Sequence, residues 1–286
     1  MRIGRKIKKN IRFLLKKILP SNFFNLIIFF LIRNKFISSY NNNKLYSENY
    51  IDKTNNINEY KISSQNYEDG IIKSLILKLK KNNKKFLEIG FDYYECNSLQ
   101  LIKQGWSGIF IDYDKEKIEN FNIIKDKFNF KKIKILNNKI SPENINSIYK
   151  KEFINTNIDF FSIDIDSLDF YVLSKIKFRP KIICLEFNPY LTPFGSVVVK
   201  YNKNNFNNSN YYYGASIQAY TKLLKQMNYR LVALDSNNVN AFFIDIKEFK
   251  SKFNEININK NKNLIIFLNK NKNIIKNIKI KKYLKY

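Results

Sequence analysis

The sequence predicts an α/β domain that is built on a mostly parallel sheet with helices on both faces. Short apolar segments that suit buried strands alternate with helical patterns along residues 63–249, and the connections between them are short. The segment Phe160–Tyr171 (F-F-S-I-D-I-D-S-L-D-F-Y) joins a buried strand to three carboxylates and then to a helical pattern. Near the end of the domain two strand patterns follow each other closely, which predicts an antiparallel hairpin.

The individual elements follow from apolar periodicity and from the Gly and Pro residues between them. Strands are expected at Lys85–Ile89, Ser107–Ile111, Lys132–Leu136, Ile158–Ile163, Lys181–Phe187, Arg230–Leu234 and Ala241–Asp245. Helices are expected at Ile71–Leu79, Leu99–Lys103, Lys115–Lys127, about 143–150, about 167–177 and Ile217–Met227.

Two strongly basic segments, 1–39 and 250–286, flank this domain. Residues 1–19 have the pattern of a basic amphipathic helix, and Phe23–Ile32 is apolar but shorter than the roughly 20 residues that cross a bilayer. The N-terminal extension therefore favours a monotopic anchor on an anionic membrane; a helical pair packed on its own domain is the alternative. Residues 40–62, rich in Asn and Ser, predict a linker. The tail after 250 predicts a basic appendage with a helix at 273–284.

The composition restricts the chemistry. The net charge of +27 favours an anionic partner, although the abundance of Lys, Asn and Ile accounts for part of it. No RRM, KH or helix-turn-helix signature occurs, so no specific nucleic acid is expected as a partner. Because the chain has no His, acid–base chemistry must use carboxylates, Tyr or Lys. Cys96 and Cys184 have no metal-ligand spacing, and they predict a reducing, cytoplasmic compartment.

Carboxylates gather where the strand Ile158–Ile163 ends. Asp164, Asp166 and Asp169 follow this strand, and Glu186 ends the neighbouring one. Ligands of open α/β sheets bind at the carboxyl ends of the strands, and crowded carboxylates raise one another's pKa, so one of these acids is expected to act as a general base. Two alternatives stay open: the oxygens hold a divalent cation such as Mg²⁺ or Mn²⁺, or Asp166 and Asp169 cap the next helix.

Seven segments in this order resemble one group of bacterial proteins. They are S-Q-N-Y-E-D-G, F-L-E-I-G, N-S-L-Q-L-I-K-Q-G-W-S-G-I-F-I-D, S-I-D-I-D-S-L-D-F-Y, E-F-N, Y-Y-G-A-S and V-N-A-F-F, within about 64–246. The group is the S-adenosylmethionine-dependent methyltransferases related to the FkbM type. The resemblance implies a Rossmann-like class I methyltransferase fold, a seven-stranded, mostly parallel sheet with a terminal antiparallel hairpin. It also implies methylation of a hydroxyl on a sugar or glycan precursor.

The resemblance also implies a site for S-adenosylmethionine. Gly90 lets the backbone approach the methionine end beside Glu88, and Asp112, at the end of the second strand, accepts the ribose hydroxyls. Asn138 flanks the adenine, and Asp164 borders both the cofactor and the acceptor. The alternatives are that Glu88 caps a helix and that Asp112 is a turn residue.

The loop before the last helix is expected to bind the acceptor. It contributes Tyr212, Tyr213 and Ser216, and Asn188 follows the fifth strand. Tyr side chains there can stack on a sugar ring or simply pack.

The sequence departs from the family after Gly90, where Phe91–Tyr94 replaces further glycines. Because glycines supply positive φ and room for a ligand, the substitution predicts a reshaped loop or a closed pocket. A degenerate methyltransferase fold that binds without catalysis is therefore one alternative function, and a basic protein that binds nucleic acid or a membrane is another.

Overall fold

The computed structural model describes residues 46–286 except 53–54, 94, 155, 166 and 203–210. The predicted N-terminal anchor, 1–39, lies outside the described residues. In the part of the chain that is described, no helix is both long enough and apolar enough to cross a membrane.

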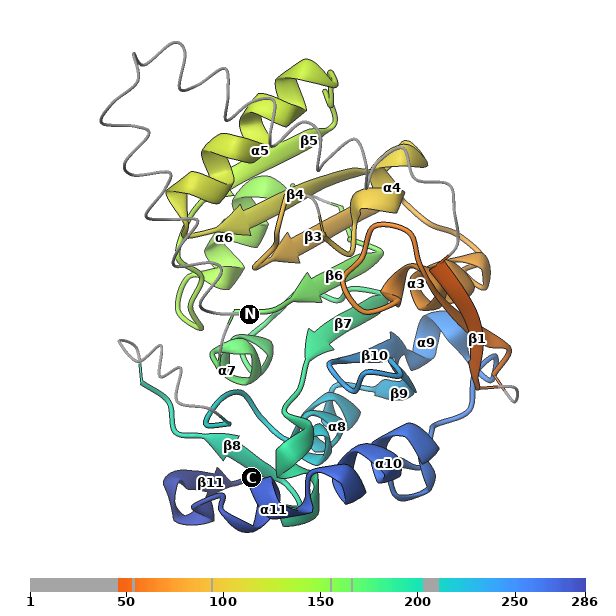
Figure 1. Ribbon diagram of the computed structural model, residues 1–286. Coiled ribbons are helices and arrows are strands. Elements are labelled where there is room, and N and C mark those ends of the chain that lie inside the picture. Colours follow the sequence, from red (N-terminus) through yellow and green to blue (C-terminus); the bar gives the residue numbers. More distant parts are fainter. Residues whose placement is uncertain (1–45, 53–54, 94, 155, 166, 203–210) are drawn as a thin grey trace, which may run out of the picture.

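A seven-stranded sheet forms the centre of the molecule, in the order β5-β4-β3-β6-β7-β10-β9 (Figure 1). Its strands are β3 (Lys85–Ile89), β4 (Ser107–Asp112), β5 (Ile133–Asn137), β6 (Phe160–Ile163), β7 (Ile182–Glu186), β9 (Tyr229–Leu234) and β10 (Asn240–Asp245). The first five are parallel, and β10 runs antiparallel to both β7 and β9. This is the Rossmann-like class I methyltransferase fold, so the predicted fold class is confirmed.

Helices cover both faces of the sheet. They are α3 (Glu68–Leu77), α4 (Leu99–Lys103), α5 (Lys115–Lys127), α6 (Ile145–Glu152), α7 (Asp169–Leu173), α8 (Ile217–Gln226) and α9 (Ile246–Phe249). Alternate strand residues point to opposite faces, so Phe160 and Phe161 of β6 belong to different apolar clusters. The cluster with Phe161 packs against α6, α7 and α8, and the cluster with Phe160 packs against α3, α4 and α5.

The structure corrects the predicted linker at 40–62. Within that segment β1 (Tyr46–Asp52) and β2 (Ile57–Lys61) form an antiparallel pair. The pair packs against α3, where a Cβ on Gly70 would lie 2.5 Å from the backbone nitrogen of Tyr60. Frequent Asn residues obscure the strand pattern, and the close approach of α3, which needs glycine, only becomes visible in three dimensions.

The basic tail is also more ordered than predicted. It contains α10 (Lys262–Lys270), α11 (Lys272–Lys276) and β11 (Tyr283–Lys285), so the helix predicted at 273–284 is wrong in its second half. β11 pairs antiparallel with β8 (Val197–Val199), which the sequence did not predict. The described residues also contain three short 3₁₀ helices: η1 (Pro189–Phe194), η2 (Ile258–Lys260) and η3 (Ile280–Lys282).

Candidate functional site

Two cavities adjoin at the carboxyl edge of the central sheet. The smaller, of about 90 Å³, lies at the end of β4, and Asp112 and Asn138 are among the residues that line it. The larger, of about 330 Å³, lies at the ends of β3, β6 and β7. Gly90, Lys117 and Asp164 line both cavities, so one ligand can extend from one into the other.

Gly90 occupies a position that only glycine fits. Its φ is +72°, and a Cβ would lie 1.6 Å from the backbone oxygen of Asp164 on the neighbouring strand end. The glycine at the end of β3 therefore brings the backbones of two strand ends into contact, directly between the two cavities.

Glu88 holds the end of the loop that follows Gly90. Its carboxylate accepts hydrogen bonds from the backbone N–H groups of Asn97 (3.0 Å) and Ser98 (2.8 Å), immediately before α4. Burial raises the pKa of Glu88 to about 7, and the hydrogen bonds from Ser98 and Asn97 limit the rise. Glu88 thus has the capping position foreseen as the alternative, while it also lines the larger cavity.

Asp112 lines the smaller cavity, and its carboxylate already accepts hydrogen bonds from within the protein. Its Oδ1 accepts from the backbone N–H of Asp114 (2.9 Å), and its Oδ2 accepts from the ammonium of Lys117 (3.1 Å) and from the backbone N–H of Phe91 (3.4 Å). A carboxylate has about four acceptor sites. Asp112 therefore retains capacity for a ligand hydroxyl, more so if Lys117 turns away.

The end of β6 and the end of β7 bring two predicted residues to the larger cavity. Asp164 is exposed, Glu186 is half-buried, and both line this cavity. Burial raises the pKa of Tyr213, and the negative charges of Glu186 and Asp164 raise it further. The Tyr213 hydroxyl is therefore within electrostatic reach of both carboxylates.

Asp169 lies apart from this group. It is 1% exposed, and its carboxylate accepts from the backbone N–H groups of Ile165 (2.8 Å) and Ser167 (3.2 Å). It lines neither cavity. Both donors lie in the loop before α7, and α7 has no side-chain cap, so this position favours a structural role in that loop over the predicted catalytic role and over the helix cap. Asp166 lies outside the described residues.

None of the four predicted acceptor residues, Tyr213 included, lines either cavity, and three of them support the loop itself. The amide of buried Asn188 donates to the backbone oxygens of Tyr211 (3.0 Å) and Tyr213 (2.9 Å). The Ser216 hydroxyl caps α8, and the Tyr212 hydroxyl donates to the backbone oxygen of Lys282 (2.8 Å). These contacts satisfy the polar groups within the protein, so the structure favours a supporting role for Asn188, Tyr212 and Ser216.

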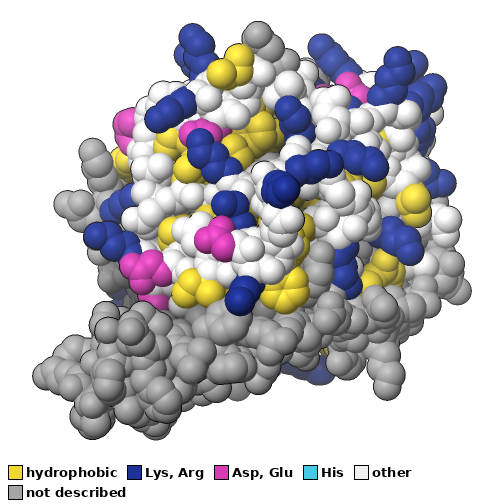
Figure 2. Space-filling model, turned by 90° about the horizontal axis from the view of Figure 1, so that it is seen from above, with side chains coloured by type: hydrophobic (Ala, Val, Ile, Leu, Met, Phe, Trp, Pro, Cys, Tyr) yellow, Lys and Arg dark blue, Asp and Glu magenta, His cyan; other side chains and the backbone are white. Residues whose placement is uncertain are grey.

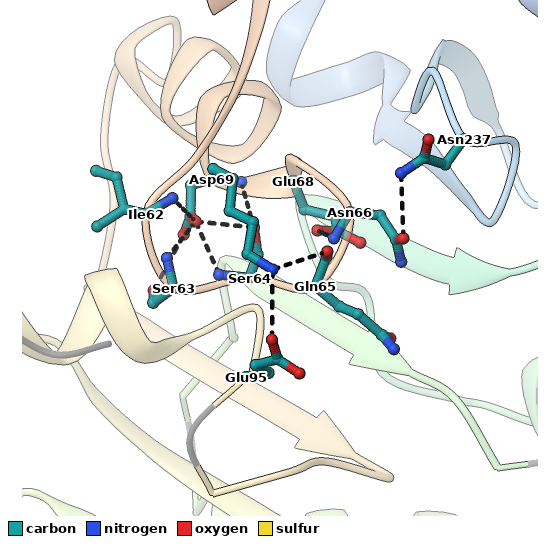
Figure 3. A network of polar contacts seen from close by, with 10 residues as sticks. Ile62, Ser63, Ser64, Gln65, Asn66, Glu68, Asp69, Glu95 and Asn237 are labelled. Atoms are coloured by element: carbon teal, nitrogen blue, oxygen red, sulfur yellow. Dashed lines mark hydrogen bonds and ion pairs between the residues drawn. The ribbon is translucent and has the colours of Figure 1, made fainter. Parts of the chain in front are cut away.

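The segment Ser64–Gly70 forms a compact polar loop beside the larger cavity (Figure 3). The Oδ2 atom of Asp69 accepts from the backbone N–H groups of Ile62 (2.7 Å), Ser63 (2.8 Å) and Ser64 (2.8 Å). One buried carboxylate thereby fixes the turn that leads from β2 into α3, which explains why the motif ends in an acid and a glycine.

Sequence reasoning missed several residues of the larger cavity. Gln65 comes from the loop before α3, Glu68 is the first residue of α3, Asn240 comes from the start of β10, and Lys117 comes from α5. The Asn240 amide donates to Glu68 Oε1 at 2.6 Å, which joins positions 172 residues apart. The motif Ser64–Gly70 could have pointed to Glu68 as a site residue. No local sequence pattern marks Asn240 or Lys117 as site residues.

Carboxylates dominate the larger cavity, although the chain as a whole is strongly basic. The acidic residues that line it are Glu68, Glu88, Asp92, Glu95, Asp164 and Glu186. Among the described residues, no group of three or more His, Cys, Asp or Glu side chains is arranged to hold a metal ion, so the divalent cation has no support. The cavity suits a ligand that carries positive charge.

Comparisons with known proteins give structural similarity only. No protein-family model and no curated protein matches the chain. Among solved structures, the chain is similar to a SAM-dependent methyltransferase from Methanosarcina mazei, at 13% identity and a TM-score of 0.40, over 59% of this chain and 94% of that one. It is also similar to a S-adenosylmethionine-dependent methyltransferase from Clostridium acetobutylicum ATCC 824 (12%, TM-score 0.40, 62% and 89%). A third is the N-terminal domain of EvdMO1 in the presence of SAH and D-fucose (12%, TM-score 0.38, 56% and 74%).

Proposed function

We propose that this protein is an S-adenosylmethionine-dependent methyltransferase that methylates a hydroxyl group. The observation that carries the proposal is the pair of adjoining cavities at the carboxyl edge, which meet at Gly90, Lys117 and Asp164. In this class of sheet, ligands bind at that edge. A ligand with a nucleoside at one end and positive charges at the other matches the two cavities.

The described residues fit this cofactor. Asp112, Asn138 and Ile140 line the smaller cavity, where they would hold the ribose and the adenine. The sulfonium and the amino group are cations, and the acid-rich larger cavity would attract both. Gly90 lets the ends of β3 and β6 approach each other where the two cavities meet.

Asp164 and Glu186 are the residues that would act on the acceptor. The cofactor supplies an electrophilic methyl group, which transfers to the acceptor oxygen in an in-line displacement. The carboxylate of Asp164 or Glu186 would orient the acceptor hydroxyl and take its proton as the new bond forms.

The proposed acceptor is a sugar or a glycan precursor. It is supported by the motifs that resemble FkbM-type proteins and by the polar lining of the larger cavity. Gln65, Asn97 and Asn240 offer amides there, beside the carboxylates, and such groups hydrogen-bond to vicinal hydroxyls.

Calorimetry with S-adenosylmethionine and with S-adenosylhomocysteine tests the enzyme proposal. Binding of both ligands, with methyl transfer to a glycan acceptor, is the expected result. If the folded protein binds neither ligand, the degenerate binding module is the correct alternative, because Phe91–Tyr93 then closes the pocket as the missing glycines suggested.

We also propose that the protein contacts an anionic membrane through residues 1–32. Figure 2 shows Lys and Arg side chains spread over one face of the described residues, with few Asp and Glu side chains among them. Deletion of 1–32 is expected to shift the protein from the anionic-liposome pellet to the supernatant, and salt should weaken the binding of the full chain. If the truncated chain still sediments with liposomes, the contact lies elsewhere.

A further inference from the structure

The larger cavity, which is lined by several acidic side chains, also contains a basic side chain. Of the described residues that line this cavity, Lys117 is the only one with a positively charged side chain. It also lines the smaller cavity, so Lys117 lies where the two cavities join. The nucleoside and the amino-acid part of a bound cofactor would meet at the same place.

The resting position of Lys117 is defined by Asp112. The ammonium lies 3.1 Å from Asp112 Oδ2, and the side chain is 37% exposed. Burial lowers the pKa of Lys117, but the charge and the hydrogen bond of Asp112 outweigh burial and raise it overall. Lys117 therefore carries its full charge at neutral pH.

The backbone beneath Lys117 is firmly placed, while the side chain can move. Lys117 lies in the first turn of α5, which Asp114 caps through a 2.9 Å hydrogen bond from the backbone N–H of Glu116. A four-carbon stem on a fixed helix lets the ammonium change partners without a movement of the fold.

The positive charge of Lys117 would complement the carboxylate of a zwitterionic ligand. The amino acid part of S-adenosylmethionine carries a carboxylate, which the ionised acidic side chains of the larger cavity would repel. A nearby ammonium offsets this repulsion and can donate to the carboxylate in a charge-assisted hydrogen bond.

We propose that Lys117 binds the carboxylate of the cofactor and makes the site selective for nucleosides that carry a complete amino acid group. This inference rests on the proposed function. When Lys117 turns to the ligand, Asp112 loses its cationic partner and becomes available to the ribose hydroxyls. The two contacts are thereby linked, since one movement of Lys117 completes both.

Two ligands that differ in the amino acid group test the inference. S-adenosylhomocysteine has the carboxylate, whereas 5′-methylthioadenosine has the same nucleoside and lacks it. Calorimetry on Lys117→Met should show a loss of roughly 10- to 100-fold in affinity for S-adenosylhomocysteine, the usual size for a hydrogen bond to a charged group. Affinity for 5′-methylthioadenosine should stay the same or increase, because Asp112 is then free of its competitor.

Lys139→Met is the matched control, since Lys139 lines the smaller cavity only and the charge changes equally. It should change both affinities by the same factor, because the two ligands share the nucleoside. The inference is overturned if Lys117→Met lowers both affinities equally or neither, or if Lys139→Met discriminates between the ligands to the same extent. A wild-type protein that binds 5′-methylthioadenosine but shows no preference for S-adenosylhomocysteine also overturns it. A wild-type protein that binds neither ligand overturns the proposed function itself.

Discussion

The β4 end and the β6–β7 end of the sheet use their carboxylates in different ways. At the β4 end, Asp112 is 6% exposed and already accepts from two backbone N–H groups and from Lys117. At the β6–β7 end, Asp164 is exposed to both cavities, and Glu186 lies beside it in the larger one. A carboxylate that is held by the protein can shape a binding site, whereas one that faces a cavity can act on a ligand.

The largest expected effect separates Asp164 from its neighbour Asp169. Asp164→Asn keeps the shape and removes the charge, so turnover should fall by roughly 10²–10⁴-fold with little change in cofactor affinity or melting temperature. Asp169→Asn should instead lose about 1–3 kcal/mol of stability, because Asp169 holds two backbone N–H groups of the loop after β6. Steady-state kinetics and thermal melts on both variants measure this. Wild-type turnover in Asp164→Asn would show that the β6 end is structural.

The next largest effect is a change of stability with pH. It arises from Glu88, a buried acid on β3, which lies between β4 and β6. Its pKa of about 7 in the folded state exceeds its ordinary value of 4.5, so its stabilising contribution is complete below about pH 4.5 and is lost as the pH rises through 7. The loss is on the order of 3 kcal/mol. Relative to Glu88→Gln, which cannot ionise, the wild type should therefore lose free energy of unfolding between pH 5 and pH 8. Urea titrations at both pH values measure this, with exposed Glu119→Gln as the control that follows the wild type.

A smaller effect tests the β4 side. Asp112→Ala should weaken S-adenosylmethionine binding by about 1–3 kcal/mol, because the ribose hydroxyls lose their acceptor. Asp126→Ala removes the same charge from the far end of α5 and should leave the affinity unchanged. Calorimetry on both variants, with melting curves to show that they are folded, decides the point. Equal affinities for Asp112→Ala and the wild type would remove Asp112 from the binding site.

The smallest effect tests whether the C-terminal tail stabilises the loop that carries Tyr213, next to the β6–β7 end of the sheet. The buried Tyr283 of β11 donates from its hydroxyl to the backbone oxygen of Tyr211 at 2.7 Å, two residues before Tyr213. Tyr283→Phe should cost about 1 kcal/mol and speed amide exchange in Tyr211–Gly214. Leu284→Ala, on the exposed side of the same strand, should leave this exchange unchanged. If both variants exchange at the wild-type rate, the tail does not order this loop.

Local sequence patterns were enough to predict the fold class and the edge of the sheet where the two cavities lie. Apolar periodicity gave the bounds of β3 and α5 without error, because both elements have strong local patterns. Gly90, Asp112 and Asp164 were also found, since each directly follows or ends a strand whose carboxyl edge is predictable.

Only the tertiary structure decided how the other acids and the flanking segments are used. Glu88 and Asp169 look like cavity residues in sequence, but their roles depend on which backbone N–H groups fold back onto them. Asn240 reaches Glu68, and β11 pairs with β8, across long stretches of chain. Such contacts have no local pattern, because they are stabilised by the packing of elements that meet only when the chain has folded.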